Sequence, residues 1–270
     1  MPVYANGTRV GRVKDVITYT MGIPRKVSSN GVYEVPTQNF SFKIPDEAVN
    51  LDSYALYNAF YDCTSLTSID LSSLTTISGN SSLLGAFYGC TSLTSIDLSS
   101  LTTISGSSGL RNAFRGCVNL TSIDLSSLTT ISGSYGLSSA FRGCVNLTSI
   151  DLSSLTTISG NNGLSSAFYD CTSLVSISFP SLSLLSQSGG LSGAFERCSN
   201  LSSVSFPALT SSSFGSNTNQ FRNMLSGGVG SCTVHFPSNL ESVIGSWSDV
   251  LNNFGGGSSV TVLFDLTATT

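Results

Sequence analysis

The sequence predicts a right-handed α/β solenoid, with a parallel sheet on its concave side, short helices on its convex side and a cap at each end. Two observations predict it: the chain repeats at a fixed step, and each repeat contains both a helical and a strand-like pattern. A fixed period of roughly 20 to 50 residues is typical of units that bury their apolar faces by stacking on one another. Cysteines recur every 27 positions, at Cys63, Cys90, Cys117, Cys144, Cys171 and Cys198, each with a phenylalanine three positions earlier.

The first half of each repeat has helical spacing. Apolar residues at i, i+3, i+4 and i+7 form the stripe of an amphipathic helix, and the residues between them are small or polar. We therefore expect one short helix per repeat, packed on the sheet. In the second repeat the stripe consists of Leu83, Ala86, Phe87 and Cys90.

The second half of each repeat alternates with period two. Ile96 and Leu98 would face the core, and Asp97 would face away from it. Gly106 then closes the turn to the next repeat. Aligning the ends on this pattern, from Phe42 to Phe236, predicts about eight strands in register and about eight coils.

The pattern AFxxCxxLTSIxL resembles the BspA-like, or Treponema-type, leucine-rich repeat. That family usually continues with a proline directly after the strand, but the 27-residue period here is longer, by an inserted SGxxG stretch such as Ser105 to Gly109. The resemblance covers roughly residues 40 to 237. It implies a leucine-rich-repeat fold in a family of surface, adhesion and host-contact proteins without a common chemistry. Prolines follow the strand at Pro45, Pro180, Pro207 and Pro237, whereas the middle repeats carry Ser72, Ser99, Ser126 and Ser153.

Three regions follow from the extent of the repeats. Residues 1–37 are a cap or attachment segment with a hairpin around Asn6-Gly7, 38–237 are the repeats, and 238–270 are a second cap. The second cap should contain a helix within Pro237 to Phe254 and a strand, Val260 to Leu266. Caps of this kind cover the open ends of a solenoid core.

Composition excludes several classes of protein. Charged residues make up 10% of the chain and the net charge is -4, which disfavours a nucleic-acid binder because such a binder needs a basic face. No apolar run approaches the roughly 18 residues of a transmembrane helix, and no signal peptide is visible. Membrane insertion is therefore not expected, and the export route stays open.

The repeated cysteines are expected to be buried thiols. Side chains stacked about 4.8 Å apart in parallel directions are poorly aimed for disulfides. Zinc requires ligands that converge on one point, which a file does not provide. Cys232 lies outside the repeat phase and has no predicted role.

A file of aspartates should run down the concave sheet. Carboxylates about 4.8 Å apart repel one another by roughly 1 kcal/mol in water, so their charge must be relieved. Hydration, raised pKa values and hydrogen bonds from flanking hydroxyls are one solution, and a bound cation or basic elongated ligand is the other, with calcium as the candidate metal. The file consists of Asp70, Asp97, Asp124 and Asp151, preceded in phase by Lys43 and followed by His235.

A second candidate site is the position after each repeated phenylalanine, where the repeats differ. Tyr and Arg are residues that interface cores favour. Either these are unrelated exposed side chains, or they form a stripe that contacts a protein or glycan. The stripe consists of Tyr61, Tyr88, Arg115, Arg142, Tyr169 and Glu196, and Arg111, Ser134, Tyr135 and the asparagines 161 and 162 could extend it.

Catalysis is disfavoured, because His235 is the only histidine and no phosphate-binding or dinucleotide-binding glycine motif is present. The sequence predicts a non-catalytic module without a cofactor that binds a protein or glycan at a cell surface, outside the cell. The alternative is a structural spacer or decoration subunit, such as part of a bacteriophage tail or capsid fibre in a virion, joined to a larger assembly through residues 1–37.

Overall fold

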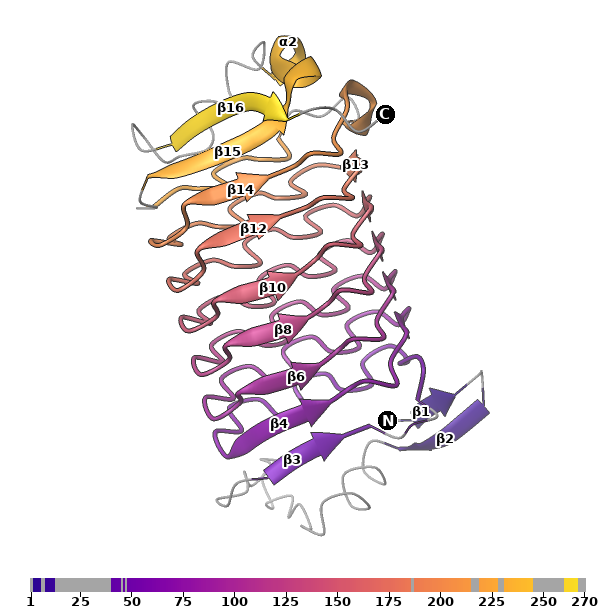
Figure 1. The fold of residues 1–270 in the computed structure, drawn as a ribbon. Helices are drawn as coiled ribbons and strands as arrows, with labels where there is room; N and C mark the ends of the chain where they lie inside the picture. The colour runs from indigo at the N-terminus through magenta and orange to yellow at the C-terminus, as the bar shows by residue number, and fades with distance from the viewer. Residues whose placement is uncertain are drawn as a thin grey trace.

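The computed structural model describes residues 2–5, 8–12, 40–44, 46, 48–185, 187–214, 219–227, 231–244 and 260–266. The repeats wind into a stack of coils, with the N-terminal strands at one end and the C-terminal strands at the other (Figure 1). Two parallel sheets follow each other along one side of the stack, and we name this side the sheet face. The first contains β3 (Phe40–Lys43), β4 (Leu66–Asp70), β6 (Ser95–Asp97), β8 (Ser122–Asp124) and β10 (Ser149–Asp151).

The second sheet continues the sheet face towards the C-terminus. It contains β12 (Ser176–Ser178), β14 (Ser203–Ser205), β15 (Cys232–Pro237) and β16 (Val260–Leu266). Without β16, the two sheets hold the eight strands expected between Phe42 and Phe236, in the expected register. The ladder is interrupted between β10 and β12, which are neighbours in the stack but belong to different sheets (Figure 1).

A third parallel sheet forms a second side of each coil. Its strands are β5 (Thr76–Ile77), β7 (Thr103–Ile104), β9 (Thr130–Ile131), β11 (Thr157–Ile158) and β13 (Leu184–Leu185). Threonine hydroxyls reinforce it, since Thr102 Oγ1 donates to the Thr75 carbonyl at 2.9 Å and Thr129 Oγ1 donates to the Thr102 carbonyl at 3.1 Å. These hydroxyls tie each coil to the preceding one.

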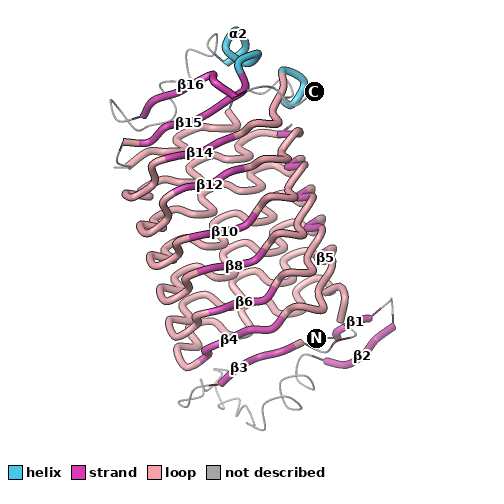
Figure 2. Tube along the Cα trace, in the orientation of Figure 1, coloured by secondary structure: helices cyan, strands magenta, loops and turns pink. Residues whose placement is uncertain are grey.

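The expected convex helices are absent from residues 48–185 and 187–210, and this prediction was wrong. The apolar stripe is buried as predicted, but the backbone around it forms consecutive tight turns (Figure 2). Every fourth residue adopts a positive φ, as at Ser108 (57°), Asn112 (54°) and Gly116 (75°). A four-residue turn repeat and a helix place side chains on the same stripe over so short a segment. We name this third side the turn face.

Hydrogen bonding between coils explains why turns replace the helix. Alternate N–H groups donate within the coil, as Arg111 N does to the Ser108 carbonyl at 3.3 Å. The others donate to the next coil, as Leu110 N does to the Gly136 carbonyl at 2.8 Å. Ser, Asn and Gly disfavour helix interiors, and Gly and Asn accept the left-handed conformation at low cost. The turn face is thus held between coils as firmly as the sheets.

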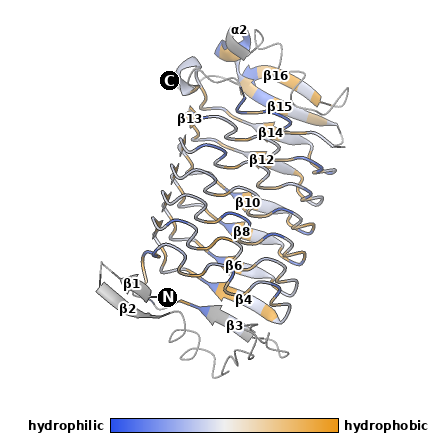
Figure 3. Ribbon diagram, turned by 180° about the vertical axis from the view of Figure 1, so that it is seen from behind, coloured by the Kyte–Doolittle hydropathy of each residue, from blue (hydrophilic) through white to orange (hydrophobic). Residues whose placement is uncertain are grey.

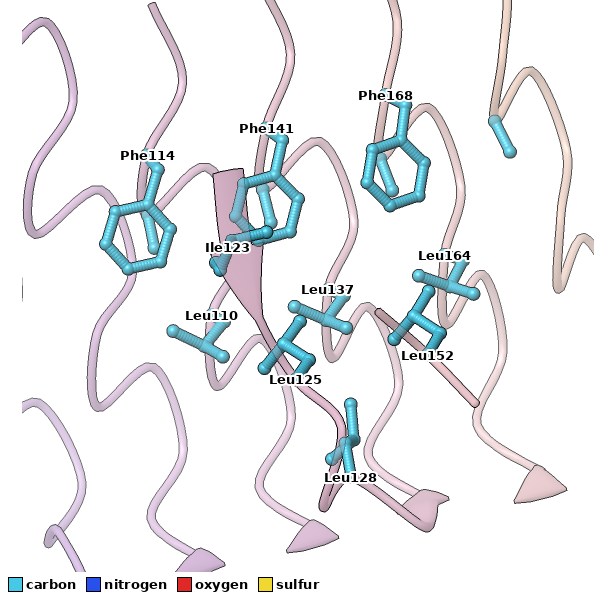
Figure 4. Close-up of a cluster of buried hydrophobic side chains, with 14 of the residues drawn as sticks. Leu110, Phe114, Ile123, Leu125, Leu128, Leu137, Phe141, Leu152, Leu164 and Phe168 are labelled. Atoms are coloured by element: carbon cyan, nitrogen blue, oxygen red, sulfur yellow. The ribbon is translucent and has the colours of Figure 1, made fainter. Parts of the chain in front are cut away.

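The stack is almost straight (Figure 1). A helix is about 10 Å wide, so helices on one side would spread the coils there and curve the solenoid. In the core, the rings of Phe114, Phe141 and Phe168 follow one another at 5.6 Å between centroids (Figure 4). That step is close to the spacing of about 4.8 Å between strands. Equal spacing on all sides leaves little curvature, which is why concave and convex do not describe this molecule.

The two ends carry the predicted cap elements in part. β1 (Pro2–Ala5) and β2 (Thr8–Arg12) form the expected antiparallel hairpin, whereas residues 13–39 lie outside the described chain. At the C-terminus the 3-10 helix Ser238–Leu240 leads into α2 (Glu241–Ile244), the rest of the expected helix lies outside the described residues, and the expected strand is β16. None of the described helices has the length and apolar character needed to cross a membrane.

The hydrophobic core runs through the whole stack. Leu, Ile, Ala, Phe and Cys from all three sides of every coil are almost completely buried. Hydrophilic and hydrophobic residues are interleaved along each coil rather than gathered at one end (Figure 3). Each coil therefore contributes equally to the core, and its outward residues form files that run along the stack.

Candidate functional site

The aspartate file lies on the sheet face as predicted. Strand pairing places Asp70 beside Asp97, Asp97 beside Asp124, and Asp124 beside Asp151. Lys43 stands at the head of the file, with Nζ 3.3 Å from Asp70 and 2.8 Å from Asp46. An open groove of about 650 Å³ runs along Lys43 and the first three aspartates.

Each aspartate is engaged by its own chain. Asp97 Oδ1 accepts hydrogen bonds from the N–H of Ser99 at 3.1 Å and from its hydroxyl at 2.7 Å, and Asp124 Oδ1 accepts from the Ser126 N–H at 2.9 Å. Hydrogen bonds from the Ser126 hydroxyl and N–H lower the pKa of Asp124. Burial raises the pKa of Asp70, but hydrogen bonds from Ser72 and Lys43 outweigh this effect, so the pKa is lowered overall. The raised pKa values expected for the file are therefore wrong for these two residues.

The turn in which each aspartate bonds the serine two residues later explains why the family's proline is missing from these repeats. An aspartate at the strand end bonds the N–H two residues later, and a proline at that later position has no N–H to offer. Accordingly, the four repeats with serine there carry the aspartate, whereas the repeats with proline carry other residues. Ser178, Ser205, His235 and Lys43 precede Pro180, Pro207, Pro237 and Pro45. The aspartate file is a set of strand-ending turns, and it needs no ligand to account for it.

Metal binding at this file stays a prediction. One oxygen of each carboxylate is already directed along its own chain towards the serine. Among the described residues, no group of three or more His, Cys, Asp or Glu side chains converges on a point where a metal could sit.

His235 continues the file on β15, where it pairs in register with Ser205. Its Nδ1 lies 3.0 Å from Asp265 Oδ1 and 3.1 Å from Oδ2 on β16. The Ser205 hydroxyl donates to the Ser178 hydroxyl at 2.8 Å, and the described hydrogen bonds include none between Ser205 and His235. Asp265 was missed from the sequence because it lies in the C-terminal strand, outside the 27-residue phase.

A second open groove, of about 750 Å³, crosses the interruption between β10 and β12. Serine side chains dominate its lining, including Ser149, Ser176 and Ser203. It was not predicted, because the interruption depends on how the strands pair. The only charged side chains in its lining are Asp124 and Asp151 of the aspartate file, and each of these accepts a hydrogen bond from a serine two residues later.

The Tyr and Arg residues stack in two groups on the turn face. The rings of Tyr61 and Tyr88 stack at 4.6 Å with an interplanar angle of 4°. The guanidinium of Arg115 lies 5.4 Å from the centre of the Tyr88 ring, and that of Arg142 lies 3.9 Å from the Tyr169 ring. Burial and the neighbouring Tyr88 raise the pKa of Tyr61, which keeps its hydroxyl protonated.

Sequence reasoning missed part of this stack. The guanidinium of Arg197 covers Tyr169 at 5.5 Å, and Glu196, the predicted end of the file, is half-buried beside it. Arg197 occupies the repeat position of Asp170, so aligning that position as well would have found it. Arg111 lies 5.0 Å from the Tyr135 ring, which places these two of the predicted extensions on the same face.

The cysteines are structural. The Cys117 thiol lies 3.2 Å from the Phe87 carbonyl of the preceding coil, and Cys144 lies 3.3 Å from that of Phe114. Burial raises the pKa of Cys144 to about 12, so the thiol stays neutral. All seven cysteines are buried, as the sequence predicts for the six in phase.

Parallel sheets on two sides, turns on the third and a core of repeated Leu, Phe and Cys define a leucine-rich-repeat solenoid. The chain belongs to the BspA type leucine rich repeat region family, whose model matches residues 29–161, 56–188 and 111–245 with 6 copies. The solenoid has about six regular turns, fewer than the eight coils expected, because the first and last strands lie in atypical repeats.

Several solved structures are similar to this chain. A leucine rich repeat protein of Treponema pallidum is 23% identical, with 85% of this chain and 87% of that chain covered and a TM-score of 0.40. The pneumococcal vaccine antigen PcpA is 14% identical, with 90% and 82% covered and a TM-score of 0.28. A leucine rich cell surface protein from Faecalibacterium prausnitzii is 16% identical, with 89% and 86% covered and a TM-score of 0.20. No curated protein matches the chain.

Proposed function

We propose that the protein is a non-catalytic binding module that recognises a protein or glycan at a cell surface through its turn face. The observation that carries this is where the repeats vary. Core positions and strand-ending turns recur almost unchanged, but the outward-facing position after each phenylalanine changes among Tyr, Arg and Glu. Tyr61 is exposed there and the other members of the file are half-buried. Variation among Tyr and Arg at an outward-facing position supports recognition, because these residues are favoured at interfaces.

The sheet face is the weaker candidate for the same role. Its aspartates are engaged in turns of their own chain, and its serines repeat without change from β6 to β10. Such a surface offers little to distinguish one coil from another. A location outside the cell, on the cell surface, is what the family resemblance implies.

The geometry around His235 supports a non-catalytic role. A nucleophile needs a base within hydrogen-bond reach, and Ser205 instead donates its hydroxyl to Ser178. His235 is paired with Asp265 near the C-terminal end of the stack and lines neither groove.

Binding of the intact protein to arrays of glycans and of cell-surface proteins tests the proposal. Tyr61→Ser combined with Tyr169→Ser should abolish capture of a ligand, and the matched sheet-face pair Asp97→Asn and Asp124→Asn should retain it. Loss in the sheet-face pair with retention in the turn-face pair would contradict the assignment to the turn face. No capture of any protein or glycan would contradict the function itself.

A structural spacer is the second candidate, favoured by hydrogen bonds between coils on all three sides of the stack. Such bonding makes a stiff rod. Deleting residues 1–37 distinguishes the two functions, because a spacer should lose assembly into its larger structure, whereas a binding module should keep its ligand.

A further inference from the structure

Between residues 48 and 227, positive charge lies on one side of the coils. All basic side chains in this range are arginines, and Arg111, Arg115, Arg142 and Arg197 lie on the turn face with the tyrosines. The described ion pairs lie at the two ends of the stack, on Lys43 and on His235. The turn-face guanidiniums therefore have no described carboxylate within ion-pair distance.

Tyrosine rings orient these guanidiniums. Arg111 lies over Tyr135 at 5.0 Å, and Arg142 lies over Tyr169 at 3.9 Å. A guanidinium that lies over a ring leaves its N–H groups pointing outward at its edge, where they can bind an anion in a bidentate manner. The rings hold the donors in place before a ligand arrives, which reduces the entropy lost on binding.

Arg115 and Arg142 occupy the same position in adjacent coils, so their backbones lie about one strand spacing of 4.8 Å apart. Their guanidiniums lie over Tyr88 and Tyr169, on opposite sides of the pair, and these two like charges repel each other. The acids of the neighbouring position, Asp62 and Asp170, belong only to the flanking coils. A ligand anion over this pair would relieve the repulsion without meeting a carboxylate in between.

Two glycines flatten the surface around Arg115 and Arg142, which we name the arginine window. Gly116 and Gly143 adopt φ values of 75° and 74° beside the two arginines, and a Cβ built on either would meet no atom closer than 3.8 Å. A ligand can therefore approach the backbone. The backbone itself offers no strand edge, since Phe114 N and Gly116 N donate to the Ala140 and Arg142 carbonyls of the next coil.

We infer that the turn face around Arg111, Arg115 and Arg142 binds a linear polysaccharide that carries sulfate or carboxylate groups. The acidic groups contact the guanidinium edges, and the hydroxyls of Tyr88, Tyr135 and Tyr169 bond the sugar hydroxyls. A polysaccharide fits better than an acidic peptide, because the N–H groups are used between coils and cannot pair with a peptide strand. The inference rests on the proposed function and names the ligand class of that same face.

Calorimetric titration of the intact protein with a size-defined heparin oligosaccharide tests the inference. Arg115→Gln with Arg142→Gln should weaken binding at least about tenfold, since each charge-assisted hydrogen bond contributes about 1.5 to 3 kcal/mol. Arg222→Gln is the control of like chemistry outside the arginine window, and it should change affinity less than about twofold, a screened-charge effect. Arg115→Lys with Arg142→Lys keeps the charge but loses the bidentate guanidinium geometry. Its heparin affinity should lie between those of the Gln pair and the control. Equal thermal midpoints confirm that all variants fold.

Four results would overturn the inference. The first is the absence of heparin binding, and the second is equal heparin binding by wild type and the Gln pair. The third is binding of poly-glutamate as tight as that of heparin. The fourth is self-association at low salt that requires both Arg115 and Asp97. The last would mean that the face binds a second copy of the chain. If the arrays instead identify a neutral glycan or a protein that depends on Tyr61 and Tyr169, the proposed function stands and this inference fails.

Discussion

The sheet face and the turn face run along the same stack at nearly the same spacing, yet they use their polar side chains in opposite ways. On the sheet face each aspartate accepts hydrogen bonds from a serine two residues later in its own coil. On the turn face Arg111, Arg115 and Arg142 each lie against a tyrosine of an adjacent coil and have no described acidic partner. Repetition of a charged residue therefore marks a structural turn here, whereas the varying turn face is the surface that we propose for a partner.

The two faces also differ in how they reach the same spacing. Extended residues of the sheets pair in the ordinary parallel manner, and the turn face uses left-handed residues whose N–H groups alternate between the same coil and the next. A regular helix could not donate to the neighbouring coil, because its N–H groups are used internally. The following predictions test this difference, starting with the largest effect.

Removing one phenylalanine should destabilise the sheet face and the turn face together, because both pack on the same core. Phe141→Ala deletes a fully buried ring that stacks on Phe114 and Phe168 at 5.6 Å. We expect a loss of about 3 to 5 kcal/mol in the free energy of unfolding, measured by urea denaturation. Reaction of the buried thiols with a thiol reagent should accelerate in parallel. Unchanged stability would mean that the coils do not share a continuous core.

Gly133→Ala tests the contact between coils at the corner that precedes the turn face. A Cβ at Gly133 would lie 2.2 Å from the Gly106 carbonyl oxygen of the preceding coil. Forcing backbones apart costs about 1 to 3 kcal/mol, and we expect a loss of this size in thermal and urea unfolding. Gly136→Ala is a comparison of similar burial, whose closest contact is an Ile131 side-chain methyl at 2.7 Å rather than a backbone atom, so its loss should be smaller. Equal losses in the two variants would contradict the close approach of coil backbones.

Gly116→Ala separates turns from a helix by the sign of its effect. In the turn, φ is 75° and the Cβ would meet no atom closer than 3.8 Å, so backbone strain alone should lower stability by about 1 to 2 kcal/mol. In a helix interior the same change would raise stability by about 0.5 to 1 kcal/mol. Chemical denaturation measures the sign. Higher stability of the variant would contradict the turn and support the helix that the sequence alone predicts.

Asp124→Ala sharpens the comparison from the sheet face, with the smallest effect. Losing the hydrogen bonds from Ser126 should cost about 1 kcal/mol or less, because the carboxylate is exposed. Its pKa is lowered in the folded state, so this stability is present above the unfolded value of about 3.9 and is lost as the pH falls through the folded value. Wild type and variant should therefore converge in acid, as urea titrations at several pH values can show.

The aspartate prediction has an internal control in this chain. Asp124→Ser combined with Ser126→Pro copies the strand ending of Ser178 to Pro180. If the two endings are alternative turns, the double variant should be nearly as stable as wild type, whereas Ser126→Pro alone should not. Equal stability of the single and double variants would show that the aspartate and the serine do not act together.

Sequence periodicity was sufficient for the repeat, the register and the buried residues. Leu, Phe and Cys recur in one phase, and a stack of identical coils can bury them only in files, so Asp70 to Asp151 and Tyr61 to Tyr169 had to align as well. It was not sufficient for the backbone of Leu83 to Cys90, because helix and turn repeat share the same apolar stripe there. The residues Asn112 and Gly116 carried the signal, since both favour left-handed φ.

The candidate site divides in the same way. Which residues share a file follows from the 27-residue step alone, because translation along the stack maps each position onto itself. Whether a charge in that file is engaged or available depends on three-dimensional contacts: the serine that holds Asp124, the ring beneath Arg142 and the strand that brings Asp265 to His235. Those contacts depend on backbone turns and strand pairing, which the period of the side chains does not specify.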